Sequence, residues 1–194
     1  MADEVTVKDT GGSFTPHEEG QFAAVCVDVI NLGARVEQFP GSPARIVDKV
    51  AIVFGTDTDK ETKDIAGEYT LSMNEKAKLR AKLLEPWRGK TYTEDEARKG
   101  IPLHKLVGKA CLLSAEHATS AKGRTYAKIV SIGPLPKKIE PPDVSGYKRP
   151  EFWAERVAKY KAECEKWADA QLKASGAFED FPEAIDAPDD DIGF

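Results

Sequence analysis

Short β-branched segments, separated by glycine- and proline-rich breaks, limit the possible folds of this chain more than any other feature. Apolar residues at alternate positions over four to eight residues are typical of strands with one buried face. One such face would carry Val25, Val27 and Val29. Another would carry Val50, Ile52 and Phe54, with Arg45 and Lys49 on the opposite face. The pattern predicts five strands, over residues 21–32, 45–54, 68–73, 111–118 and 125–132.

One helical stretch lies among these strands. Asn74 is a favourable N-cap, the following residues 75–85 place Leu79 and Leu83 on one face, and Pro86 is expected to end the helix. Five strands with a helix between the third and the fourth follow the element order of an oligonucleotide-binding (OB) Greek-key barrel. We therefore predict a mainly β fold with this architecture. Shorter helical turns are expected after Thr93 and over residues 103–106.

The chain divides into unequal parts beyond this core. Residues 133–150 contain five prolines and two glycines, and a long amphipathic helix follows. Its apolar seam, which we expect to be buried on the barrel or across a dimer, consists of Trp153, Val157, Tyr160, Cys164 and Trp167. The expected parts are a flexible segment (1–19), the barrel (20–138), a proline-rich linker (139–150), the helix (151–175) and a disordered acidic tail (176–194).

Charge is distributed unevenly along the sequence. The formal net charge is −5, but residues 177–194 hold seven acidic residues and no basic one. Residues 20–176 carry 27 basic and 21 acidic residues, a net charge of +6. A basic body with an acidic tail is informative about partners, although the tail could also serve solubility alone.

Several function classes are disfavoured. No segment approaches the roughly 20 apolar residues of a membrane helix, and the acidic start lacks the apolar core of a signal peptide. Three dispersed cysteines argue against a disulfide framework or a cysteine zinc site, and they favour a reducing compartment. The dispersed histidines argue against a His-rich metal site, and we expect no cofactor. Gly89-Lys90-Thr91 matches the end of a P-loop, but Leu84 occupies the position of its first glycine.

The last six residues are Asp189-Asp190-Asp191-Ile192-Gly193-Phe194. They resemble the acidic tip of bacterial single-stranded-DNA-binding proteins, with Gly193 in place of a proline. A terminal phenylalanine presents a ring to an apolar pocket and a carboxylate to a basic rim, and the aspartates add long-range attraction. The resemblance implies that a replication or recombination protein binds Asp189, Asp190, Asp191, Ile192 and Phe194.

The body carries a second resemblance, over roughly residues 17–138. The segments EGQFAAVCVDVINLG, LSMNEKAKLRAKLLEPWRGKTYT, LVGKACLLSAEH and GRTYAKIVSIGPLPK resemble phage-encoded single-stranded-DNA-binding proteins of the OB-fold type. This resemblance carries no catalytic motif. It implies a protein of phage DNA replication and recombination that acts in the cytoplasm of a bacterial host.

Single-strand binding requires cations for phosphates and aromatic rings for bases. The candidate DNA-binding residues are Arg45, Lys49, Tyr69, Trp87, Arg88, Lys90, Arg124, Tyr126 and Lys128. Trp87 could instead cap the core, and Tyr69 and Tyr126 could face inwards.

Three hypotheses follow from the sequence. The first is a non-enzymatic protein that binds single-stranded DNA with little sequence preference. The second is an adaptor whose OB-like body binds protein instead of DNA. The third and weakest is a small enzyme that uses Cys26 with His104 or His117, or a carboxylate pair.

Overall fold

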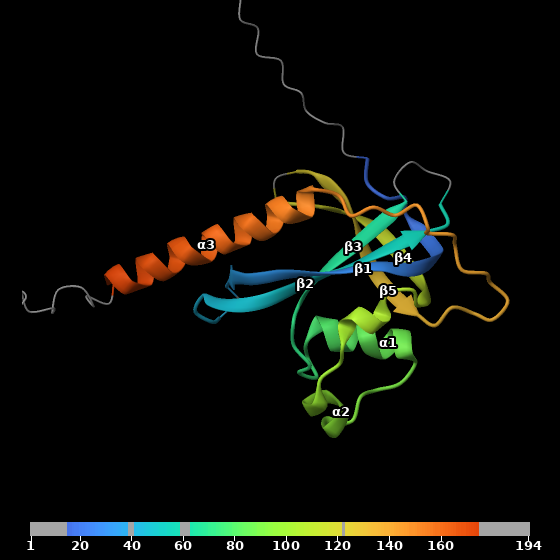
Figure 1. Ribbon diagram of the computed structural model, residues 1–194, viewed down its shortest axis with the longest axis horizontal. Helices are drawn as coiled ribbons and strands as arrows, with labels where there is room; N and C mark the ends of the chain where they lie inside the picture. The colour runs from blue at the N-terminus through green and yellow to red at the C-terminus, as the bar shows by residue number, and fades with distance from the viewer. Residues whose placement is uncertain (1–14, 39–40, 59–62, 122, 175–194) are drawn as a thin grey trace, which may run out of the picture.

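The computed structural model describes residues 15–38, 41–58, 63–121 and 123–174 (Figure 1). Within these residues, five antiparallel strands form one open sheet in the order β3-β2-β1-β4-β5. The strands are β1 (Gly20–Glu37), β2 (Arg45–Thr56), β3 (Asp64–Thr70), β4 (Ala110–Thr119) and β5 (Thr125–Gly133). The prediction of a mainly β fold with five strands is confirmed.

Strand β1 is the longest and is irregular. Its first residues pair with β4 and the rest of its length pairs with β2. The register with β2 shifts between Cys26 and Asp28, which is the signature of a β-bulge. The bulge rotates the following side chains, so that Val29 packs on the same side of the sheet as Cys26 while Val27 packs on the other. The expectation that Val25, Val27 and Val29 share one face is therefore wrong.

Two apolar clusters occupy the two faces of the sheet, because neighbouring residues of β2 point to opposite sides. The inner cluster contains Val50, Ile52 and Phe54, as predicted, and is closed by the helical segments. The outer cluster contains Ala51 and Val53. Strands β3 and β5 are the two edge strands of the open sheet, and they come close to each other.

The helical region between β3 and β4 differs from the prediction. Asn74 caps a single turn, and the first regular segment is the π-helix η1 (Leu79–Leu84). It runs directly into α1 (Glu85–Arg88), where Pro86 lies in the first turn and Gly89 ends the helix with a φ of +74°. Pro86 therefore does not end the helical region, which continues to Arg88.

Other local predictions agree with the structure. Thr93 caps α2 (Glu94–Lys99) in a capping box with Glu96, and η2 (Leu103–Leu106) is a 3-10 turn. Strands β4 and β5 form the expected hairpin. The third strand, expected over 68–73, lies instead at Asp64–Thr70.

Residues outside the sheet are held against it. His17 is buried, and its Nε2 lies 2.7 Å from Thr56 Oγ1, so the end of the segment expected to be flexible packs on β2. Val144, in the proline-rich segment, covers the backbone of Gly55, where a side chain would collide with it.

Helix α3 (Phe152–Ala174) lies along β1 on the outer face of the sheet (Figure 1). Trp153 and Tyr160 are buried in the outer cluster, and Val157 packs beside them. Farther along the seam, Cys164 and Trp167 are only half-buried. The first half of the predicted seam therefore packs on the sheet. Among the described residues, no helix is long and apolar enough to cross a membrane.

Docking of α3 should depend on Trp153, which is 3% exposed. We expect Trp153→Ala to lower the free energy of unfolding by about 3 to 5 kcal/mol, because a large ring leaves a cavity in the outer cluster. Trp167→Ala is the control and should cost clearly less, since its ring is half-buried. Urea unfolding monitored by circular dichroism measures both; equal losses would contradict this packing.

Candidate functional site

Three predicted residues meet in one groove. Arg45, Lys49 and Tyr69 line a depression of about 880 Å³ at the end of the sheet. Its walls are the last part of β1, the start of β2, the end of β3 and residues 72–78. The basic groove, as we name it, contains the cations Arg35, Arg45, Lys49, Lys76 and Lys78, the anions Glu37 and Glu68, and the ring of Tyr69.

Lys49 is the buried cation of the basic groove. Its Nζ lies 2.6 Å from the carboxylate of Glu37 and donates a 3.0 Å hydrogen bond to Thr70 Oγ1. A buried charge needs such partners to offset its lost hydration. Lys49 therefore joins β1, β2 and β3 at the floor of the groove.

Tyr69 forms part of the wall. Its ring lies over Gly67, where a Cβ atom would approach the ring carbons to 2.7 Å. Burial raises the pKa of Tyr69 to about 12, so the phenol stays neutral at physiological pH. Its side chain packs partly against the inner cluster and also borders the basic groove.

Buried Arg80 fixes the wall that carries Lys76 and Lys78. Its guanidinium donates to Met73 O at 3.1 Å and Tyr92 O at 2.8 Å, and its Nε donates to Glu85 at 2.7 Å. Hydrogen bonding from Arg80 lowers the pKa of Glu85. These contacts hold the irregular turn before η1 in place, so the exposed lysines have a defined position.

The structure places three other candidates away from the basic groove. Trp87 is buried against Phe54, with ring centroids 5.5 Å apart, and its Nε1 donates to Ala110 O at 2.9 Å. Its ring serves the core and cannot receive a base there. Arg88 pairs with Glu96 at 2.6 Å and covers the ring of Tyr92, while Lys90 is exposed nearby.

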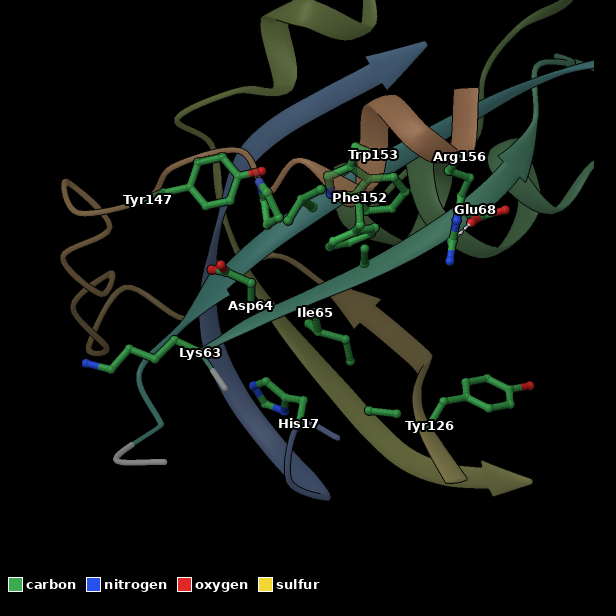
Figure 2. A pocket seen from close by; sticks show the side chains of 14 residues that line it. His17, Lys63, Asp64, Ile65, Glu68, Tyr126, Tyr147, Phe152, Trp153 and Arg156 are labelled. Atoms are coloured by element: carbon green, nitrogen blue, oxygen red, sulfur yellow. Dashed lines mark hydrogen bonds and ion pairs between the residues drawn. The ribbon is translucent and has the colours of Figure 1, made fainter. Parts of the chain in front are cut away.

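Arg124, Tyr126 and Lys128 are exposed on the β4–β5 hairpin. Tyr126 borders a second hollow of about 570 Å³, between β3, β5 and the start of α3 (Figure 2). This aromatic cavity is defined by four rings and four charged residues: Tyr126, Tyr147, Phe152, Trp153, Lys63, Asp64, Glu68 and Arg156.

Glu68 lines both hollows. Its carboxylate accepts hydrogen bonds from Arg156 and, at 2.9 Å, from the hydroxyl of Tyr160, and Arg35 lies 3.9 Å away. Arg35 also donates to the Tyr160 oxygen at 3.2 Å. Glu68 thus connects α3 to β3 and β1.

Sequence reasoning missed Arg35, Lys76 and Lys78 in the groove, and Phe152 and Arg156 at the cavity. Arg35 and Glu37 lie beyond the predicted first strand (21–32), although their spacing of two residues would have placed them on one strand face. The candidate partner-binding residues 189–194 lie outside the described residues.

The arrangement around Cys26 does not support a nucleophile. Burial raises the pKa of Cys26 to about 12, so almost no thiolate exists at neutral pH. In the described part of the chain, no group of three His, Cys, Asp or Glu side chains is placed to hold a metal ion.

Comparison with protein-family models, with curated proteins and with solved structures finds no match for this chain.

A charged clamp positions the start of α3. Arg149 donates two 2.7 Å hydrogen bonds to Asp28, and the hydroxyl of Tyr147 adds a third at 3.1 Å. Burial opposes ionisation of Asp28, but these hydrogen bonds outweigh it and hold the pKa below its ordinary value. The proline-rich segment is therefore fastened to β1 immediately before the helix.

This clamp predicts a pH dependence. Because the folded pKa of Asp28 is lowered, its contribution to stability is present above the unfolded pKa of about 3.9 and is lost as pH falls through the folded value. Arg149→Met should lower the free energy of unfolding at pH 7 by up to roughly 1 kcal/mol, since the guanidinium is half-exposed. Urea unfolding should show this deficit shrinking below about pH 4. A deficit that is constant with pH, or that Lys148→Met reproduces, would contradict the clamp.

Proposed function

We propose that this chain binds single-stranded DNA with little sequence preference, through the basic groove. The observation that carries the proposal is the charge of that groove: five cations against two carboxylates, with an aromatic ring in the wall. Phosphates bind to clustered cations and release counterions, which gives affinity without reading sequence. The groove contains three of the nine residues proposed from sequence alone.

We further propose that the sheet is an OB-type Greek-key barrel. Two features support this: the strand order, with β3 and β5 close together, and the helical segment between β3 and β4. OB folds bind oligonucleotides on the face of strands 2 and 3 and on the neighbouring loops. The basic groove lies at β2, β3 and the β1–β2 hairpin, which is the corresponding position.

The biological setting is proposed from the resemblances in the sequence. The protein would act without catalysis in phage DNA replication or recombination, in the cytoplasm of a bacterial host. Residues 189–194 would recruit a replication or repair protein, with Phe194 entering a pocket on that partner.

The groove makes a quantitative prediction. Lys76→Glu combined with Lys78→Glu should weaken binding of labelled oligo-dT, measured by fluorescence anisotropy. The slope of log affinity against log salt should become shallower by about 1.4, because each phosphate contact on a single strand contributes about 0.7. Duplex DNA of equal length should bind more weakly, since its bases are not free to stack.

The matched control is Lys99→Glu with Lys105→Glu, which makes the same charge change at exposed lysines outside the groove. The control should keep most of the parent affinity. Equal losses in both double variants would mean that overall charge, and not the groove, determines binding. A parent that fails to bind oligo-dT at low salt would refute the proposal and favour the protein-adaptor hypothesis.

The tail predicts a separate effect. Phe194→Ala removes the ring but keeps every aspartate, so it should abolish capture of a replication protein that recognises such tips while oligo-dT affinity stays unchanged. Deletion of residues 186–194 should leave DNA binding intact or tighter, most visibly at low salt, because the tail's charge no longer competes for the cations. A pull-down in which Phe194→Ala captures the partner as well as the parent does would contradict pocket insertion.

A further inference from the structure

We propose that the aromatic cavity binds one unstacked nucleobase of the same strand whose phosphates lie in the basic groove. This inference rests on the proposed function and extends it by a second subsite with different chemistry. The ligand class is a planar heteroaromatic ring attached to a sugar-phosphate chain.

Two of the four rings of the cavity are largely exposed. Phe152 is 46% exposed and Tyr126 is 41% exposed, and both border the same hollow from different elements. Figure 2 shows Phe152 and Trp153 at the start of α3, and Tyr126 on β5 with its ring pointing away from them. The Phe152 and Trp153 centroids lie 4.7 Å apart at a tilt of 35°. Such surfaces suit a stacked base.

The charges of the cavity favour a neutral ring over a phosphate. The two cations, Lys63 and Arg156, are balanced by Asp64 and Glu68, whereas the groove has three more cations than carboxylates. The Arg156 guanidinium is also occupied by Glu68, and it lies 5.3 Å from the Trp153 centroid. A volume of about 570 Å³ is within the range of small-molecule sites and accommodates a nucleoside.

The two subsites adjoin. Glu68 lines both, and Arg35, Phe152 and Arg156 border a third, smaller depression that touches them. One strand can therefore continue from the groove past Arg156 to the cavity. Helix α3 covers part of the sheet's outer face. The rings of Phe152 and Trp153 at its start provide aromatic surface beside the covered part.

The experiment compares two ligands on the full-length protein: oligo-dT and an abasic strand of equal length. Phe152→Ala should weaken oligo-dT binding roughly 5- to 150-fold, the range for loss of one stacking ring, and should leave abasic binding and the salt slope unchanged. Tyr126→Ala should act in the same direction. Phe152→Tyr, which keeps a ring, and Val130→Ala, an exposed residue of β5 that does not line the cavity, should bind both ligands as the parent does.

A second measurement does not depend on the variants. Oligonucleotides carrying 5-iodouracil should crosslink to the peptides that contain Phe152 or Tyr126, as mapped by mass spectrometry. If the parent binds oligo-dT but Phe152→Ala keeps its full preference over the abasic strand, and crosslinks map only to the groove, the cavity does not hold a base and a partner protein's side chain becomes its candidate occupant. If the parent binds neither strand, the groove proposal itself fails.

Discussion

The arrangement of both hollows depends on the contacts of the Glu68 carboxylate. It accepts hydrogen bonds from two α3 side chains, Arg156 and Tyr160, while Arg35 approaches from β1. Hydrogen bonds to charged groups are worth roughly 1.5 to 3 kcal/mol when shielded from water, and less for the part-exposed Arg156. The apolar contacts of Trp153 supply most of the docking energy, but they are non-directional. Glu68 fixes the helix at one position along β3, and that position sets the border between groove and cavity.

Local sequence signals predicted those elements whose structure is determined locally. The capping box at Thr93, the β4–β5 hairpin and α3 all follow from short-range chemistry, and all are present. The errors lie where distant contacts decide. The bulge after Cys26 inserts a residue into β1, which moves Val29 to the face of Cys26, and no periodicity rule reveals it. Residues 75–85 look like one helix, but Arg80 reaches back to Met73 and forward to Tyr92, and this tertiary network imposes a turn followed by a π-helix.

The sequence indicated which types of residue would form the candidate site better than it indicated where those residues lie. Arg45 and Lys49 were placed on the correct strand face because strand alternation is strict. Lys76 and Lys78 fall in the predicted helix of residues 75–85, and a regular helix there did not indicate their place in the groove wall. Trp87 has an indole ring that could stack on a base. The sequence cannot show that this ring lies in the core, where its N–H donates to Ala110 O. Phe152 preceded the predicted seam, so nothing in the helical pattern assigned it a role.

Buried and exposed cations of the basic groove have different physical roles. Lys49 is buried and neutralised by Glu37, so its loss would leave an unpaired carboxylate and would disturb the junction of three strands. Lys76 and Lys78 are exposed, so their charges remain hydrated and contribute little to stability. Exposed charges nevertheless act over about 10 Å at moderate salt, which is enough to attract a phosphate chain before contact. In the groove, the buried pair of Lys49 and Glu37 shapes the floor, and the exposed lysines on the turn held by Arg80 leave their charges open to solvent.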